Sequence, residues 1–333
     1  MQRPVAGQGV DRTDGFAGCV LVARGDEVLY RAEGGPADRE AGTTCSPQTR
    51  FQIASVSKQF AAALVLLLVQ EGVVDLARPI GTMLGGCPAA WRDLTLHHLI
   101  SNTSGIEHWQ ALPGFDPVRP GEREGLLERM AALPLRHVPG SAWTYSSPGF
   151  LLAATVVEAV TGRRWPDLVA SRLLEPLGLA STTVGAVPHG DVARGYRGGR
   201  RVDVDDYAWL PGTGDLWSTV DDLARWTTAL HGGGVLTGTS HARLVHPHGA
   251  VGTDSPPGGP VLQQGYGYGC FLGSLAGRRA WMHPGDNPGY RSFVAHLPDT
   301  GETVVALTNE ESVDLDDVLR RVVPVLDGAS ALD

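Results

Sequence analysis

The chain has 333 residues, of which 42% are hydrophobic, and a formal net charge of −9 from 36 acidic and 27 basic side chains. This length and apolar content allow one large domain or two smaller ones with an ample core. The acidic balance argues against a nucleic-acid partner, because phosphate backbones are bound by clustered basic residues. Residues 1–14 carry several charges and no apolar signal-peptide core, so the sequence as given predicts a cytoplasmic protein.

The cysteines and histidines show no spacing typical of a disulfide framework or a metal site. The four cysteines are widely spaced and form no C-x-x-C pair, so we expect reduced, buried thiols. The histidine cluster His241, His246 and His248 lies in sequence rich in proline and glycine, which favours a loop over a metal site. Walker A, dinucleotide-binding and G-x-S-x-G sequences are absent, and we expect no metal and no cofactor.

Strands are predicted near both ends of the chain. Cys19 to Arg24 and Glu27 to Ala32 flank a Gly25-Asp26 turn and predict a β-hairpin. Three further strands are expected near the other end, around Tyr266 to Phe271, Arg291 to Leu297 and Thr303 to Thr308.

Helices are predicted between these strands and after them. Apolar residues recur at helical spacing in Thr95 to Ser101, Glu122 to Leu133, Phe150 to Thr161, Trp165 to Leu174 and Thr219 to Leu230. A last amphipathic helix is expected over Asp314 to Leu326, with a break at Pro324 near its end.

This order of elements predicts an α+β fold, in which an antiparallel sheet built from both chain ends is flanked by helices and carries an inserted helical region. We expect residues 1–75 and 210–333 to form the sheet-containing part and residues 76–209 to form the insert. The active site would lie in the cleft between them.

The only lysine of the chain stands among 26 arginines, at Lys58 in the run Ser55-Val-Ser-Lys58. An arginine guanidinium stays protonated in proteins, whereas a partly buried lysine amine can lose its proton and act as a base. Side chains three residues apart share one face of a helix, so the Ser55 hydroxyl and the Lys58 amine are expected within hydrogen-bonding reach. The alternative interpretation is a solvated lysine near a helix start.

The sequence after Lys58 predicts a buried helix. Gln59 to Glu71 is apolar around most of its circumference and is followed by Gly72, which suits a left-handed C-cap. The apolar run Phe60 to Val69 is shorter than the roughly 20 residues of a membrane span, so we expect no membrane partner. The N-terminus of this helix would favour negative charge at Ser55 and help to lower the pKa of Lys58.

A serine nucleophile also needs a second proton-transfer group and donors for an oxyanion, and two later segments offer candidates. Tyr145 is expected on a loop just before an apolar helix, and His283 where a strand could line a cleft, two residues before Gly285. Taken singly, Tyr145 is more often a core or loop tyrosine and His283 a satisfied histidine.

Together and in this order, these segments resemble the serine β-lactamase and penicillin-binding-protein superfamily, in its class C-like branch of D-Ala-D-Ala carboxypeptidases, D-aminopeptidases and esterases. The pattern S-x-x-K, Y-x-N and K-T-G or H-x-G is matched by Ser55-Val-Ser-Lys58, Tyr145-Ser-Ser147 and His283-Pro-Gly285. The resemblance extends from Gly18 to Asn309, through similar connecting stretches. It implies the β-lactamase/transpeptidase-like α/β sandwich.

The resemblance also implies a role for each motif residue. Ser55 would be the acylated nucleophile, Lys58 the amine that helps to deprotonate it, and Tyr145 the phenol that relays a proton to the leaving group. His283 would replace the motif lysine at the substrate edge of the sheet. The backbone N–H groups of Ser55 and Asp286 would form the oxyanion hole.

Two positions depart from the family pattern. Ser147 stands where an asparagine is expected, which would shorten or remove a contact with a substrate amide. Asp286 follows Gly285 and puts a carboxylate beside the expected oxyanion site. This charge would oppose catalysis unless the side chain points away, pairs with Arg291 or binds a substrate cation.

The motifs therefore predict a serine hydrolase that forms an acyl-enzyme on small ester or amide substrates, of the esterase or D-amino-acid peptidase type. One alternative is an acyltransferase that uses the same intermediate. The other is a catalytically weak, penicillin-binding-like ligand-binding protein, which Ser147 favours and Lys58 disfavours. A strict β-lactamase is disfavoured because such enzymes act outside the cytoplasm. The stretch Glu107 to Glu124 is expected to overhang the cleft and set selectivity.

Overall fold

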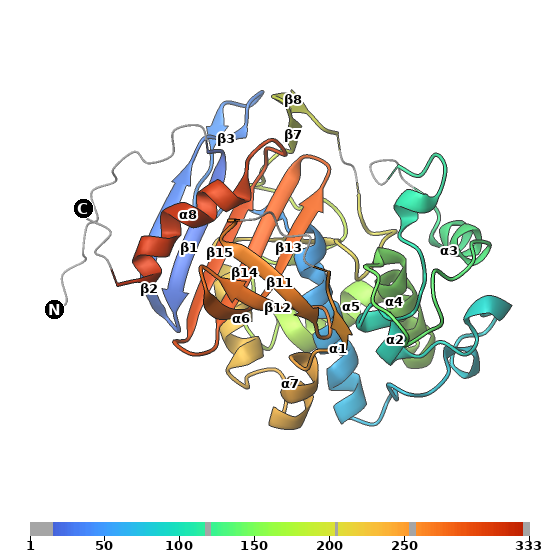
Figure 1. Ribbon diagram of the computed structural model, residues 1–333. Coiled ribbons are helices and arrows are strands. Elements are labelled where there is room, and N and C mark those ends of the chain that lie inside the picture. The colour runs from blue at the N-terminus through green and yellow to red at the C-terminus, as the bar shows by residue number, and fades with distance from the viewer. Residues whose placement is uncertain (1–15, 117–120, 204–205, 253–257, 329–333) are drawn as a thin grey trace.

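The computed structural model describes residues 16–116, 121–203, 206–252 and 258–328. Its centre is an eight-stranded antiparallel sheet with the order β10-β11-β12-β13-β14-β15-β1-β2 (Figure 1). The strands are β1 (Gly18–Arg24), β2 (Glu27–Gly34), β10 (Gly249–Ala250), β11 (Val261–Tyr266), β12 (Phe271–Leu275), β13 (Arg278–Asn287), β14 (Tyr290–Leu297) and β15 (Glu302–Thr308). Because β1 pairs with β15, both ends of the chain build one sheet, as predicted.

β1 and β15 lie inside the sheet and bury nearly all of their residues. Both are almost continuous apolar runs, which suits strands that are covered on both faces. Leu21 and Val305 point into the core that contains α1, whereas Val20 and Val304 point into the core that contains α8. The sheet is therefore the middle layer between two helical layers.

Helices cover both faces of this sheet (Figure 1). α8 (Leu315–Leu326) lies on one face, and α1 (Ser57–Gln70), α6 (Val220–His231) and the short α7 (Gly238–Leu244) lie on the other side. α1 is apolar around its circumference because it is packed from several sides, and its Phe60 ring stacks on Trp226 of α6 with 3.8 Å between ring centroids. The predicted α+β sandwich is confirmed.

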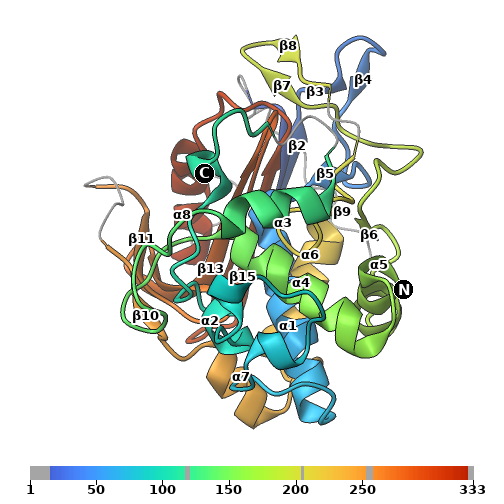
Figure 2. The same ribbon diagram turned by 90° about the vertical axis from the view of Figure 1, so that its right-hand side faces the viewer.

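The helices between residues 96 and 174 form a further group, part of which packs against α1 (Figure 2). These helices are α2 (Leu96–Ile100), α3 (Arg123–Ala131), α4 (Ser147–Thr161) and α5 (Trp165–Val169), which continues into a π-helical turn over Ala170–Leu174. Short strands complete the fold, namely β3 (Pro36–Asp38), β4 (Thr43–Thr44), β5 (Phe51–Gln52), β6 (Thr183–Val184), β7 (Tyr196–Arg197), β8 (Arg200–Arg201) and β9 (Leu216–Ser218). Single 3₁₀ turns occupy Ala54–Val56, Ile80–Thr82, Ala89–Trp91 and Trp109–Ala111.

Three local predictions are wrong. The single strand expected from Tyr266 to Phe271 is instead the end of β11, a turn over residues 267–270 and the start of β12, because Gly269, with a φ of 61°, reverses the chain against the carbonyl of Lys58. Pro324 does not break α8, which continues to Leu326, because the missing N–H falls in the last turn and the apolar face stays packed. His241 lies on α7 instead of a loop.

The four cysteines are buried and free. Among the helices in the described ranges, none has the length and hydropathy needed to cross a membrane.

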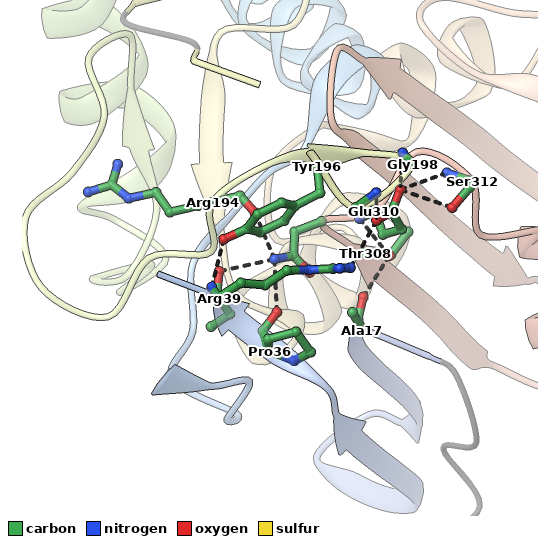
Figure 3. A network of polar contacts seen from close by, with 12 residues as sticks. Ala17, Pro36, Arg39, Arg194, Tyr196, Gly198, Thr308, Glu310 and Ser312 are labelled. Carbon is green, nitrogen blue, oxygen red and sulfur yellow. Dashed lines mark hydrogen bonds and ion pairs between the residues drawn. The ribbon is translucent and has the colours of Figure 1, made fainter. Parts of the chain in front are cut away.

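A polar network ties the residues after β15 to the β7–β8 hairpin (Figure 3). The Glu310 carboxylate accepts a hydrogen bond from the N–H of Gly198 at 3.0 Å and pairs with Arg39 at 2.9 Å. The Arg39 guanidinium lies over the ring of Tyr196, 4.6 Å from its centroid. These contacts hold the hairpin, and with it Arg197, beside the sheet.

Candidate active site

A cavity of about 940 Å³ lies beside β13 and is lined by residues of the sheet, by Ser55 and by residues of the chain between His108 and Gly214. Seven of the eight candidate residues line it, namely Ser55, Tyr145, Ser147, His283, Gly285, Asp286 and Arg291. The eighth, Lys58, lies directly behind Ser55 and is 0% exposed. The structure thus gathers residues from distant parts of the sequence at one site.

Ser55 lies on a strained turn that leads into α1. The residue before it, Ala54, has a φ of 48°, a left-handed conformation that costs a residue with a side chain about 1–3 kcal/mol. The turn is held by Gln52, whose side-chain oxygen accepts the N–H of Ala54 at 2.7 Å, and by Ser292, whose hydroxyl donates to the carbonyl of Ile53 at 2.6 Å. This anchoring fixes the direction of the Ser55 side chain.

Ser57, the nearest competing hydroxyl, is buried elsewhere. Its Oγ accepts the N–H of Leu216 on β9 at 3.2 Å, and it does not line the cavity.

The Lys58 amine lies 2.9 Å from Ser55 Oγ and donates to the carbonyl of Thr213 at 2.6 Å. Burial lowers its pKa to about 7, because the charged form loses its hydration, while the charge of Asp215 opposes this shift. An amine with this pKa is a proton acceptor near neutral pH. The alternative of a solvated surface lysine is excluded.

Asp215 is a buried carboxylate that no motif in the sequence signals. It accepts hydrogen bonds from the indole N–H of Trp165 at 3.1 Å and from the N–H of Gly212 at 3.0 Å. Burial raises its pKa to about 7, although these hydrogen bonds and the Lys58 charge oppose the rise. The site therefore contains two buried groups of opposite charge that titrate in the same range.

Tyr145 lies on the loop before α4, as predicted, and Asn102 positions this loop. Asn102 has a φ of 59°, and its backbone and side-chain oxygens accept the N–H groups of Thr144 at 2.9 Å and Ser146 at 3.0 Å. Lys58 Nζ lies 5.1 Å from the centroid of the Tyr145 ring. Burial raises the pKa of the phenol, and hydrogen bonds with the Ser55 and Ser147 hydroxyls oppose that rise.

His283 lies on β13 and is completely buried. Its Nδ1 lies 2.6 Å from the carbonyl oxygen of Pro284, and because a carbonyl only accepts, Nδ1 carries the proton and Nε2 accepts from the Tyr266 hydroxyl at 3.3 Å. Burial and the neighbouring Lys58 charge lower its pKa to about 3. His283 is thus uncharged, unlike the lysine whose motif position it occupies.

Gly285 brings the β13 backbone against the Ser55 turn. A Cβ atom at this position would lie 2.6 Å from the carbonyl oxygen of Ile53 and 3.0 Å from Cβ of Ala54. The next residue, Asp286, is paired in register with Arg291 on β14, with 4.0 Å between their side chains. The Asp286 side chain is 66% exposed.

Ser147 begins α4, and its Oγ lies 3.2 Å from Nε2 of His108. His108 was not singled out from the sequence, because it belongs to no motif and only falls within the segment expected to overhang the cleft. Of that segment, Trp109 and Phe115 also line the cavity and stack with 5.1 Å between ring centroids. Residues 117–120 lie outside the described residues.

His241, His246 and His248, the histidines that cluster in the sequence, form ring contacts in two separate groups, His241 with His231 and Trp281. The His248 ring lies 5.2 Å from the ring of His246 and 5.1 Å from the ring of His97, measured between centroids. Within the described ranges, no group of three histidine, cysteine or carboxylate side chains has the arrangement of a metal centre.

The chain is similar to a known protein family and to several named proteins. The model of the Beta-lactamase family matches residues 6–326. Esterase EstB of Burkholderia gladioli is 38% identical over 176 residues, which are 48% of this chain and 44% of the esterase. D-aminopeptidase of Brucella canis is 28% identical over 92% of this chain and 58% of its own length. The chain thus spans about half the length of these relatives.

Solved structures show the same fold. D-amino acid amidase from Ochrobactrum anthropi SV3 aligns with a TM-score of 0.80 and 24% identity, over 94% of this chain and 93% of the amidase. A D-stereospecific amidohydrolase from Streptomyces aligns with a TM-score of 0.77 and 24% identity, over 93% and 94% of the two chains. The match of the family model over nearly the whole length shows that this chain belongs to the Beta-lactamase family.

Proposed function

We propose that this protein is a serine hydrolase in which Ser55 attacks the carbonyl carbon of a small ester or amide and becomes acylated. The observation that carries the proposal is the pair of Ser55 Oγ and Lys58 Nζ, 2.9 Å apart, with the pKa of the amine lowered to about 7. The uncharged amine accepts the Ser55 proton as the new C–O bond forms.

Tyr145 supplies the second proton transfer. When the tetrahedral intermediate collapses, the bond to the leaving group breaks, and the leaving oxygen or nitrogen takes the phenol proton. The Lys58 ammonium, whose Nζ lies over the Tyr145 ring at 5.1 Å from its centroid, then returns a proton to the phenol oxygen. In the second half of the reaction, water attacks the acyl carbon with the same proton transfers. The bond to Ser55 Oγ then breaks, which releases the acid and restores the serine.

The oxyanion is proposed to bind the backbone N–H groups of Ser55 and Asp286. Ser55 precedes the N-terminus of α1, where the helix dipole favours negative charge. Gly285 allows the strand that carries Asp286 to approach the same turn. His283 is proposed to act as an uncharged group that lines this edge of the cavity.

The cavity favours a substrate with an apolar portion. Aromatic side chains form much of its wall, among them Trp109, Phe115, Trp143, Tyr207 and Phe271. The names of the relatives, an esterase and a D-aminopeptidase, support small esters or amides as the substrate class. Transfer of the acyl group to another acceptor would use the same intermediate and differ only in the second nucleophile.

A weak ligand-binding protein is the second candidate, and Ser147 in place of the motif asparagine favours it. Labelling by a fluorophosphonate separates the two, because only an activated serine is phosphonylated. We expect one equivalent on intact mass and peptide mapping to Ser55. Ser57→Ala should label normally and Ser55→Ala should not label. A wild-type protein that stays unlabelled, or a label on another residue, would contradict the proposal.

A further inference from the structure

The space beside Ser147 is occupied by the imidazole of His108, and the three side chains of His108, Ser147 and Tyr145 all line the cavity. His108 Nε2 lies 3.2 Å from Ser147 Oγ. Its ring is nearly parallel to that of Tyr145, with 17° between the planes and 5.9 Å between the centroids. The His108 imidazole therefore lies beside both Ser147, where the sequence departs from the family motif, and Tyr145, the proposed proton donor.

The proton of this imidazole can be assigned to one nitrogen. His108 precedes the 3₁₀ turn Trp109–Ala111, and its Nδ1 accepts the backbone N–H of Gln110 at 3.4 Å. Burial, with a contribution from the Lys58 charge, lowers the pKa of His108 to about 4, so the ring is neutral at pH 7. A neutral ring that accepts at Nδ1 carries its proton on Nε2.

The hydrogen bond therefore runs from His108 to Ser147. Because the Ser147 oxygen accepts the Nε2 proton, its own proton is left to donate elsewhere. The Ser147 hydroxyl also opposes the rise in the pKa of Tyr145, which lies two residues before it. A phenol oxygen that accepts a hydrogen bond is a stronger acid, because the phenolate formed on proton loss is stabilised. Two nearly parallel rings, His108 and Phe271, also lie against Tyr145 and restrict its plane.

We infer that His108 is a positioning residue, which orients the Ser147 hydroxyl toward Tyr145. His108 and Ser147 together then take the role of the motif asparagine. This inference rests on the proposed function, because it assigns His108 an effect on the proton that Tyr145 gives to the leaving group. It predicts that loss of His108 lowers kcat/KM more for substrates whose leaving group depends more on that proton.

The test compares two aryl esters of the same short acid, a p-nitrophenyl ester and an unsubstituted phenyl ester. They have similar shapes, but the phenolate is the more basic leaving group and depends more on protonation. The ratio of their kcat/KM values is measured, since kcat/KM reports the acylation half of the reaction. A merely structural role of His108 would change both values by the same factor and leave the ratio constant.

Two substitutions of His108 separate its hydrogen bond from its ring. His108→Phe keeps an aromatic ring but removes the donor. We expect kcat/KM for the phenyl ester to fall by roughly tenfold, a part of the roughly 10²–10⁴-fold that a positioned general acid contributes, with a much smaller loss for the p-nitrophenyl ester. His108→Gln places an amide N–H near the position of Nε2 and should keep a ratio close to that of the wild type. Ser147→Ala removes the acceptor and should change the ratio of the two esters in the same direction as His108→Phe. It tests the inference on its own if His108→Phe does not fold.

Equal losses for both esters in His108→Phe and Ser147→Ala, or no loss in either, would overturn the inference. Fluorophosphonate labelling keeps this result separate from the proposed function. Its fluoride leaving group needs no proton from Tyr145, so His108→Phe and His108→Gln should label at Ser55 like the wild type. Failure of the wild type to label would contradict the hydrolase itself, whereas normal labelling with a constant ester ratio would contradict only the role of His108.

Discussion

At the scale of single residues, Lys58 and Asp215 control each other's charge. Both are buried, and burial moves the pKa of each to about 7 from opposite directions. The carboxylate stabilises the ammonium form of Lys58 and therefore raises its pKa above the value that burial alone would give. Thr213, two residues before Asp215, holds the same amine through its carbonyl. The segment Thr213 to Asp215 thus holds Lys58 in position and raises the basicity that burial lowers.

Replacing Asp215 by asparagine should move the pH dependence of the reaction in a defined direction. Since the proposed base must be unprotonated, kcat/KM of the wild type should rise with pH through a midpoint near the Lys58 pKa of about 7. Asp215→Asn removes the charge that raises this pKa, so the midpoint should move to lower pH. The measurement is kcat/KM for a p-nitrophenyl ester between pH 5 and 9, in the working range of about two pH units on each side of neutrality.

The matched control is Asp221→Asn, which alters a half-exposed carboxylate that pairs with Arg31 and does not line the cavity. Its midpoint should equal that of the wild type. A folded Asp215→Asn protein with an unmoved midpoint would show that the acid limb reports a group other than Lys58.

At the scale of elements, the site depends on the contact between β13 and the 3₁₀ turn Ala54–Val56. Gly285 allows this contact, because no side chain separates the strand from Ile53 and Ala54. Gln52 reinforces it, since its side-chain oxygen accepts both the N–H of Ala54 and the amide of Asn287 at 2.8 Å. The strained Ser55 turn and the end of β13 are therefore held together directly.

Gly285→Ala should separate these two elements. The added Cβ would lie 2.6 Å from the Ile53 carbonyl oxygen, so either the strand or the turn must move. We expect a loss of stability of about 1–3 kcal/mol from overpacking and a loss of kcat/KM of about 10²-fold from misplacement of Ser55. Thermal unfolding and ester hydrolysis, measured well below the midpoint of unfolding, check the two effects.

Gly125→Ala on α3 serves as the control, because no atom other than those of its chain neighbours and its own helix backbone lies within 4 Å of its added Cβ. It should keep full activity and gain up to about 1 kcal/mol from the better helix propensity of alanine. Full activity of Gly285→Ala would mean that the Ser55 turn tolerates displacement of β13.

The sequence predicts the secondary-structure elements and motif residues of this site better than the polar residues that surround them. The hairpin, the helices and the residues Ser55, Lys58 and Tyr145 are predictable because each carries a local pattern of periodicity or motif spacing. Asp215 and His108 are not, because their roles arise from contacts between segments far apart in the chain, such as the bond from Lys58 to Thr213. The division into residues 1–75 with 210–333 and residues 76–209, and the cytoplasmic location, stay predictions.

At the scale of the whole molecule, elements from distant parts of the chain bring charges of both signs to the cavity. Arg197 from β7 pairs with Glu311 at 2.7 Å, and the network around Glu310 holds that hairpin in place (Figure 3). Asp286 faces Arg291 at 4.0 Å with its side chain largely exposed, a separation at which an ion pair contributes little. Asp286 is therefore the carboxylate with the weaker partner, and it is the one next to the proposed oxyanion site.

A carboxylate in this position should lower the rate unless a cationic part of the substrate offsets its charge. We therefore predict that substrates with a free α-amine are preferred over their N-acetyl forms, and that Asp286→Asn removes this preference while turnover of neutral esters stays equal or rises. The measurement is kcat/KM for one amine and N-acetyl ester pair in both proteins at low ionic strength, where the screening length exceeds about 10 Å. Added salt should weaken the preference in the wild type. An amine-to-acetyl ratio that is the same in both proteins would assign Asp286 to the pairing of β13 with β14 through Arg291, and the cavity would then select its substrates by its aromatic wall alone.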